Sequence, residues 1–386
     1  MQVEYIVILI HNIFGGPITK DGSLKSCEKF IYTTVVIVLS ATCFSLCMLD
    51  LRRMLYTRDL VLSVIDLLTL FGIVGTTFAI QTSTLMKYLY KPKASIIRCL
   101  DDIDGHLYTL DMHRDPSRSF SANCAVGFGG TIIITLGYLL ANVQRINGTN
   151  GLLFAFKAYG LMIIFLMHGL FLVFSFQIWK RIRYMVVLLE KMIATTERKA
   201  ASNVTSEHAY SRICRDLKAL AIVQSHCFRS VNCLNDECGL ANVAIFGLFF
   251  YVLTAKSFQL FYVCSIELKQ HGFIFAHILE PFVLIIAVFL YFFVATYLGE
   301  MVLRETQLVV NNLHKLESVR FISQHKDVQT EEKHSELVEQ LGNQIVHQPI
   351  CFTVMNFFQI DLKFFHLVMA SVGTYLIILL QFDFQN

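Results

Sequence analysis

The chain has 386 residues, of which 55% are hydrophobic and only 16% charged, and its formal net charge is +3. Soluble globular proteins carry roughly 25% charged residues, so this composition indicates a membrane protein. The small net charge, without a basic patch among aromatic residues, argues against nucleic acid as a partner. The first segment, MQVEYIVILIHNIFGG, has no basic stretch or small-residue cleavage site. It is therefore expected to be retained rather than removed as a signal peptide.

Apolar stretches predict seven membrane spans. A bilayer core of about 30 Å needs about 20 mostly apolar helical residues. The stretches that meet this requirement are 30–50, 60–85, 125–143, 152–179, 240–265, 273–298 and 364–382. The predicted fold class is therefore all-α, a polytopic membrane protein with seven transmembrane helices. No internal repeat relates the two halves, which argues against a transporter built from inverted repeats.

The basic residues in the connections predict the orientation, because cytoplasmic loops carry the excess of Lys and Arg. Leaving aside Lys256 within a span and Lys363 at the edge of another, 24 basic residues fall on one side and six on the other. The N-terminus is thus predicted inside and the C-terminus outside, opposite to a G-protein-coupled receptor. Asn147 begins a sequon in an outer connection and is a candidate glycosylation site.

The long inner connections are predicted to be cytoplasmic helical extensions, because apolar residues recur in them at helical spacing. The fourth span continues through WKRIRYMVVLLEKMIATTERK, breaks at AASNVTSE and resumes toward the fifth. A further amphipathic helix, HSELVEQLGNQIVHQ, ends at Pro349. One face of it carries Leu337, Leu341 and Ile345. This face is expected to pack in an inner anchor domain, and apolar faces of this kind need partners in the same chain or in neighbouring subunits.

The sequence shows no recognisable enzyme, cofactor or metal site. DDIDGHLYTLD lacks the residues that a calcium loop needs at its first and last positions, and Cys227, Cys233 and Cys238 follow no standard zinc spacing. Sequences of the G-x-S-x-G, H-E-x-x-H and Walker A types are absent. His168 and His366, within predicted spans, are interpreted as packed, hydrogen-bonded side chains rather than ligands.

Charged residues in the outer halves of two spans suggest a pair. By helical rise, Lys256 lies about 14 Å and Glu280 about 10 Å below the outer ends of the fifth and sixth spans. Either ion alone in hydrocarbon costs several kcal/mol, so each should face protein or water. One interpretation is a structural salt bridge. The other is a water-accessible ligand cavity that includes Gln259 and Asp66, with His277 as a further candidate.

The last span carries an unexpected polar stripe. Thr374, Ile378, Gln381 and Gln385 share one helical face in GTYLIILLQFDFQN. One interpretation is that Gln381 lies in the lipid headgroup layer. The alternative is a pore in which the last helices of several subunits line a shared axis and their Gln381 amides narrow it.

TYLIILLQF, from Thr374 to Phe382, resembles the TYhhhhhQF signature of insect gustatory receptors, in which h is any hydrophobic residue. The preceding FFQIDLKFFHLVMASVG, with Ile360 and Asp361, is also similar to that family, as are the seven spans and the inside N-terminus. The resemblance implies a homotetrameric, tastant-gated cation channel related to insect odorant receptors. Such a channel passes monovalent cations and calcium, and it assembles alone or with related receptors in the plasma membrane of sensory neurons.

The resemblance also implies a division of the chain. Residues 1–29 form a cytoplasmic N-terminal segment, and residues 30–298 contain transmembrane helices one to six with the ligand pocket in their outer half. The second of these segments includes the cytoplasmic helical connections 86–124 and 180–239. Residues 299–361 form cytoplasmic anchor helices, and residues 362–386 form the pore-lining seventh helix with a short outer tail.

In this resemblance Gln381 and Phe382 form the gate and constriction of the pore. Thr374 and Ile378 share the Gln381 face, and Asp383 would place carboxylates at the outer mouth, where they concentrate cations.

The expected ligand pocket faces the outside and lies among helices two to six. Sugar-sensing relatives often carry an acidic residue directly after Thr-Tyr, where this chain has Leu376, so a bitter or plant compound is favoured over a sugar. The alternative is a seven-helix G-protein-coupled receptor or a multi-pass solute transporter. The expected ligand-binding residues are Asp66, Lys256, Gln259, His277 and Glu280.

Overall fold

The structure is a computed structural model that describes residues 38, 42, 45, 60–90, 96–110, 129–140, 149–202, 207–270, 275–321 and 328–384. Within these residues almost everything is helical. The named elements are α3 (Leu60–Tyr90), α4 (Ile96–Thr109), α6 (Thr149–Ser202), α7 (Glu207–Gln270), α8 (Phe275–Phe321), α9 (Val328–His347), β1 (Thr353–Val354), β2 (Phe358–Gln359) and α10 (Leu362–Phe384).

Five helices in the described part of the chain are long and apolar enough to cross a membrane, namely α3, α6, α7, α8 and α10. They correspond to the second, fourth, fifth, sixth and seventh predicted spans. The third predicted span overlaps a shorter apolar helix, Gly129–Leu140, and the first lies outside the described residues apart from three isolated positions. The predicted class, a helical polytopic membrane protein, is confirmed. Which side of the membrane each end occupies stays a prediction.

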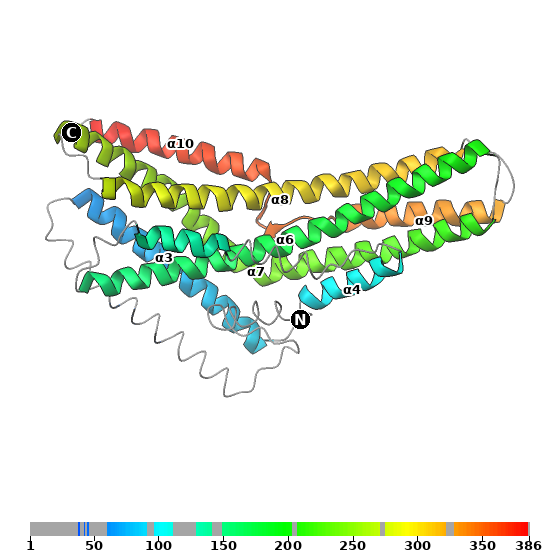
Figure 1. Ribbon diagram of the computed structural model, residues 1–386, viewed down its shortest axis with the longest axis horizontal. Coiled ribbons are helices and arrows are strands. Elements are labelled where there is room, and N and C mark those ends of the chain that lie inside the picture. Colours follow the sequence, from blue (N-terminus) through cyan, green and yellow to red (C-terminus); the bar gives the residue numbers. More distant parts are fainter. Residues whose placement is uncertain are drawn as a thin grey trace.

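Three helices are far longer than a bilayer requires. α6, α7 and α8 contain 54, 64 and 47 residues, against about 20 for one crossing. They run the length of the molecule, with α3 and α10 beside one part and α4 and α9 beside the other (Figure 1). We call the end of the bundle at which α10 ends the distal end, and the opposite end the proximal end. The predicted break between the fourth and fifth spans is confirmed, since α6 ends at Ser202 and α7 begins at Glu207.

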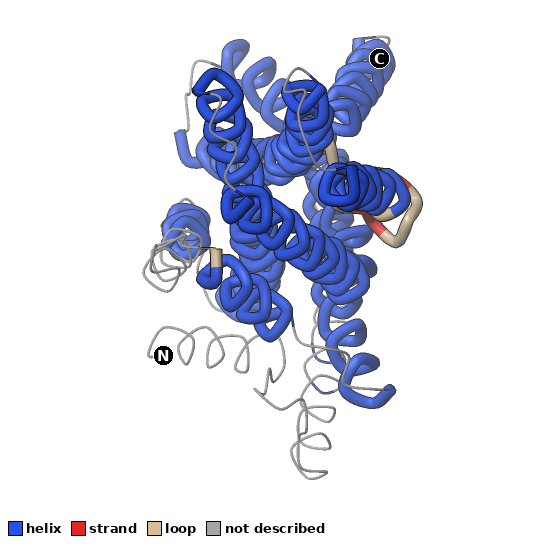
Figure 2. Tube along the Cα trace, turned by 90° about the vertical axis from the view of Figure 1, so that its right-hand side faces the viewer, coloured by secondary structure: helices blue, strands red, loops and turns tan. Residues whose placement is uncertain are grey.

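A short hairpin joins α9 to α10, which the all-α prediction did not include. Thr353 pairs with Gln359 in an antiparallel two-stranded sheet, which lies at the edge of the helix bundle (Figure 2). Met355 and Asn356, between the strands, have positive φ values of 49° and 59°. Two-residue strands are too short to show the alternating pattern by which a strand is predicted.

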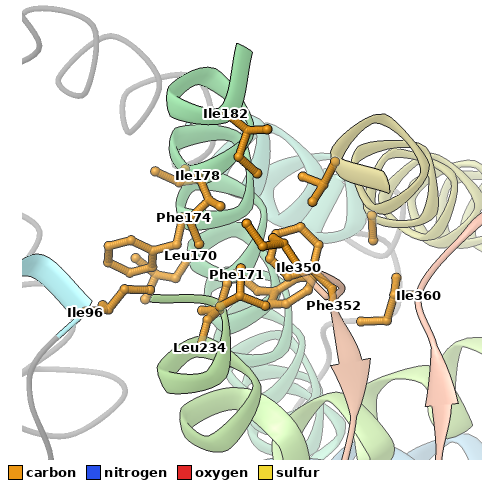
Figure 3. Close-up of a cluster of buried hydrophobic side chains, with 14 of the residues drawn as sticks. Ile96, Leu170, Phe171, Phe174, Ile178, Ile182, Leu234, Ile350, Phe352 and Ile360 are labelled. Carbon is orange, nitrogen blue, oxygen red and sulfur yellow. The ribbon is translucent and has the colours of Figure 1, made fainter. Parts of the chain in front are cut away.

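The segment around the hairpin is part of the core. Phe352 and Ile360 belong to the same buried apolar cluster as Phe171 and other side chains of α6, and Phe352 lies beside Phe171 (Figure 3). The rings of Phe171 and Phe352 have centroids 5.7 Å apart in an edge-to-face arrangement, a favoured geometry for aromatic pairs. The connection into α10 is therefore held by burial on both sides of the exposed turn, at Phe352 and Val354 before it and at Ile360 after it.

The apolar face of α9 packs within its own chain. Leu341 and Ile345 are buried and Leu337 is half-buried, and the amide of Gln344 donates to the carbonyl of Ala221 in α7 at 3.2 Å. The open choice between the same chain and a neighbouring subunit is therefore decided for this face.

A buried ion pair fixes α4 to α6 in the proximal part. The guanidinium of Arg181 donates to both carboxylate oxygens of Asp104, with Nε–Oδ1 at 2.9 Å. Arg181 also donates to the side-chain oxygen of Gln177 at 3.1 Å. A paired arrangement of this kind is required because an unpaired buried guanidinium would be strongly destabilising.

Candidate functional site: a charged cluster above an apolar cavity

Lys256 is the centre of a polar cluster that joins three helices. Its ammonium donates to Asp66 of α3 at 2.9 Å, to Gln259 of α7 at 2.7 Å and to Glu280 of α8 at 3.4 Å. Lys256 is fully buried, Gln259 and Glu280 are buried, and Asp66 is half-buried. The three acceptors match the three N–H donors of an ammonium, which explains how a lysine is accommodated inside an apolar bundle.

The sequence places these side chains by simple helical geometry. Gln259 follows Lys256 by three residues, so both lie on one face of α7. Glu280 lies near the start of α8, immediately before Pro281, which has no N–H to donate to the preceding turn. The antiparallel course of α7 and α8 then brings Glu280 to the level of Lys256.

A small apolar cavity lies one helical turn proximal to the cluster. Thr69, Val252 and Leu284 line it, and each is three or four residues from a member of the cluster on its own helix. The other lining residues are Ile73, Leu161, Ile164, Phe165, Leu248, Phe249 and Val288. Its volume of about 10 Å³ is comparable to the space for one water molecule, so a larger ligand must widen it.

A second polar layer lies beyond the proximal end of this cavity. His168 is fully buried, and its Nε2 lies 3.3 Å from the carbonyl oxygen of Tyr291 in α8. Aromatic rings surround it, with the centroid of Phe249 at 5.3 Å. The hydroxyl of Tyr291 contacts that of Thr131 at 3.1 Å. The interpretation of His168 as a packed, hydrogen-bonded side chain is confirmed for Nε2. Its Nδ1 has no hydrogen-bond partner within the described part of the chain.

The start of α10 is fixed by contacts with α7 and α8. Asn235 of α7 donates to the carbonyl of Cys351 and accepts from the N–H of Thr353, both at 3.0 Å. On α8, any side chain at Gly299 would overlap the carbonyl oxygen of Ile360. Asp361 then caps α10 by accepting from the N–H of Phe364 at 2.8 Å.

Beyond this start, α10 presents two different faces. Val372 is buried, and Leu376 and Leu380 pack against apolar side chains of the same chain. Thr374 and Ile378 are exposed, as is Gln381 one turn further on. Leu376 lies about 200° around the helix from Thr374. The described part of the predicted stripe thus lies on the side of α10 that the chain itself leaves uncovered.

The predicted site residues divide into those that the structure brings together and those outside its description. The cluster unites Asp66, Lys256, Gln259 and Glu280, and the predicted Lys256–Glu280 pair is present. His277 lies in α8, and Phe382 and Asp383 lie in α10, but their side chains are outside the described set. Asn147 also lies outside the described residues.

Sequence reasoning did not assign two features of the site. Gly299 lies inside an apolar helix, where glycine is unfavourable, and that is a usable signal of close backbone approach. The unpartnered nitrogen of His168 left no sequence signal, because it depends on which residues surround the ring.

The fold and the site define a polytopic helical membrane protein with a charged cluster and a small apolar cavity between its spans. The sequence matches the family model described as "7tm Chemosensory receptor" over residues 15–386, so the chain belongs to this family. The family is one of receptors, not of enzymes. A comparison with curated protein sequences gives no match.

Solved structures with the same fold include the insect olfactory receptor OR5 from Machilis hrabei. The structure in complex with eugenol is 13% identical with a TM-score of 0.65, and the match covers 98% of this chain and 97% of the other. The structure described without that ligand is 12% identical with a TM-score of 0.66 and covers 98% of both chains. At these identities the likeness establishes the shared fold alone.

Proposed function

We propose that the chain is a gustatory receptor, a tastant-gated, non-selective cation channel that assembles as a homotetramer or with related receptors. The exposed face of α10 carries this proposal, since Thr374, Ile378 and Gln381 are uncovered by their own chain. Four such helices around one axis would present a neutral, partly polar stripe to a water-filled path. Phe382 would help to close this path, and Asp383 would concentrate cations, including calcium, at its outer mouth.

In this proposal the distal end faces the outside of the plasma membrane of a sensory neuron. The segment 1–29 lies in the cytoplasm with the inner connections 86–124 and 180–239. The segment 30–298 carries the spans and the pocket, 299–361 the anchor, and 362–386 the pore. Asn147 is then accessible to glycosylation.

The proposed ligand site comprises the Lys256 cluster and the cavity beneath it. The walls of the cavity are apolar side chains apart from Thr69, whose hydroxyl donates to the carbonyl of Ile65 at 2.7 Å. A sugar would leave most of its hydroxyl groups without partners there, which is costly. The lining therefore favours a mainly apolar tastant, such as a bitter or plant compound, over a sugar.

A ligand that widens the cavity would open the pore through α8. Leu284 and Val288 of α8 line the cavity, and Gly299 of the same helix touches the backbone of Ile360, two residues before α10 begins. A displacement of α8 would therefore reach the start of α10 through a contact of two backbones, which cannot yield as side chains do. A ligand shifts the closed–open equilibrium only by its preference for the widened state.

Recordings from cell-free membrane patches test this function. An agonist should open the channel without GTP and without a coupled solute. Gln381→Ala should change single-channel conductance or selectivity, Phe382→Ala should raise current without ligand, and Asp383→Asn should lower cation current mainly at low ionic strength. Leu376→Ala, on the opposite face of α10, is the matched control and should leave conductance unchanged. Wild-type conductance and gating in all three variants would exclude α10 from the pore.

The Glu280→Gln variant tests the ligand pocket separately from the pore. Glu280→Gln should shift agonist sensitivity with normal surface expression if the cluster takes part in ligand binding. If the cluster is only structural, both Glu280→Gln and Lys256→Gln should instead lower expression, and a charge swap should restore it. A double-mutant cycle separates these outcomes.

A further inference from the structure

His168 has one nitrogen atom whose hydrogen-bonding capacity is unused. Its ring is fully buried among Phe171, Phe246, Phe249 and Tyr291. Nε2 contacts the Tyr291 carbonyl, whereas Nδ1 is buried without a hydrogen-bond partner among the residues that the structure describes. Most buried side-chain polar atoms in proteins do have a partner, so each exception calls for an explanation.

The contact at Nε2 determines the chemical character of Nδ1. A carbonyl oxygen can only accept, so Nε2 must carry the proton that it donates to Tyr291. An imidazolium ion in this apolar shell would be strongly disfavoured, so the ring is neutral. In a neutral ring with the proton on Nε2, Nδ1 is an acceptor with one lone pair. The missing partner is therefore a donor, an O–H or an N–H.

His168 is next to the cavity on the same side of α6. Leu161, Ile164 and Phe165 line the cavity, and His168 continues their face one turn further along, at i+7, i+4 and i+3. Its ring also packs against Phe249, a cavity-lining residue. Phe249 precedes Lys256 by seven residues on α7, which separates the two by about 10 Å along the helix axis. The widened cavity would thus have the Lys256 cluster at one end and His168 at the other.

We infer that Nδ1 of His168 accepts a hydrogen bond from the ligand, and that the ligand is a small, largely apolar molecule with a phenolic or alcoholic O–H or an aromatic N–H. Its apolar body would occupy the cavity between Phe165 and Val252, and movement of the Phe165 and Phe249 rings would bring its donor to His168. This inference rests on the proposed ligand pocket and specifies its ligand class. Among the described residues no group of three or more His, Cys, Asp or Glu could hold a metal ion, so a donor is the better partner for this nitrogen.

Matched pairs of probes test the inference. p-Cresol and 4-methylanisole differ in one O–H, and indole and 1-methylindole in one N–H. Binding is measured from the melting temperature of the purified full-length protein in detergent, titrated with each probe, because a ligand that binds the native state raises that temperature. We expect the donor of each pair to bind about 5- to 10-fold more tightly than its methylated partner, the effect of one buried neutral hydrogen bond.

His168→Phe removes the acceptor while retaining the ring volume. It should bring the affinity ratio of each pair close to one, with little change for the methylated probes. Ser175→Ala is the control, because Ser175 is a buried, unpartnered polar residue seven positions further along α6; it should keep the wild-type ratio. If His168→Phe does not accumulate, His168→Leu, which also lacks a hydrogen-bond acceptor, replaces it in the same measurement.

Three results would overturn the inference: no melting shift with any probe, equal affinity within both pairs for the wild type, or an unchanged ratio after His168 is replaced. Patch recordings with the same probes separate it from the proposed function. Preferential binding of the donors without any current would uphold the role of His168 and contradict the channel. Currents of equal potency within each pair would support the channel and contradict the role of His168.

Discussion

α6 and α10 are both apolar enough to cross a membrane, yet they have opposite surroundings. In the span window of α6, 83% of residues are buried within the chain, against 11% in α10. α6 is enclosed by its own chain, with Gly160 so close to α3 that an added Cβ would lie 2.5 Å from the side chain of Ile73. A hydrophobic sequence therefore does not distinguish a helix buried within its own chain from one that is exposed on the surface of that chain. The apolar surface of α6 is covered by other helices of the same chain, whereas that of α10 must be covered by lipid or by other subunits.

The two helices also differ in how they are attached. α6 packs against α3, α7 and α8 and forms an ion pair with α4. α10 is held most firmly at its start, where Asp361 caps it and Gly299 admits the backbone of Ile360. Toward its distal end most side chains are exposed. A helix fixed at one end and uncovered at the other is suited to move at its distal end.

The largest effect is expected at the fixed end of α10. Gly299→Val should prevent folding or surface delivery, because its side chain would overlap a backbone carbonyl that cannot rotate away. Gly373→Ala within α10 is the matched control, since nothing lies within 4 Å of a Cβ there, and it should fold normally. Fluorescence-detected size exclusion measures both. A wild-type profile for Gly299→Val would show that this contact does not fix α10.

Next in size is a direct comparison of the two helices by the same substitution. Leu170 of α6 is 6% exposed and Leu367 of α10 is 66% exposed. Leu170→Ala should lower the free energy of unfolding by about 3 kcal/mol, through lost burial and the cavity left behind. Leu367→Ala should cost less than about 1 kcal/mol within a subunit. Thermal or denaturant unfolding in detergent gives both values, and equal costs would mean that α10 is already covered by a partner.

A smaller loss is expected from breaking the ion pair between α4 and α6. Asp104→Asn should destabilise the protein by about 2 kcal/mol, because it leaves the Arg181 guanidinium buried without its counter-charge. Asp104 keeps some exposure, so the effect is below that of a fully enclosed pair. Replacing both residues with apolar ones of similar volume should recover most of the loss. No recovery in the double variant would assign the effect to packing instead.

The smallest effect concerns the cap of α10. Asp361→Ala removes the acceptor for the N–H of Phe364 and should cost about 1 kcal/mol. Asp361→Asn retains an acceptor and should cost less. Amide hydrogen exchange in the first turn of α10 should accelerate in the Ala variant alone. Equal protection in both variants would show that burial, rather than the cap, holds this turn.

Much of the architecture followed from local sequence. The spans now seen as α3, α6, α7, α8 and α10 are runs of apolar residues at helical length. A charged residue within such a run has few alternatives to pairing with its opposite on the next helix, and Lys256 and Glu280 do pair. The amphipathic pattern around Leu341 and Ile345 likewise predicted a packed helix. In each case the physical cause is contained in the segment itself or in its neighbour.

What the tertiary structure decided depends on residues far apart in the chain. The partner of the α9 face and the contact of Gly299 with Ile360 each join segments that sequence periodicity does not relate. Asp66 joins Lys256 across 190 positions, and the free acceptor on His168 exists only because α8 supplies one partner and not a second. Local propensity and hydrophobic pattern determine which segments are helices. The packing of all the helices together determines which of their surfaces are buried and which polar atoms have no hydrogen-bond partner.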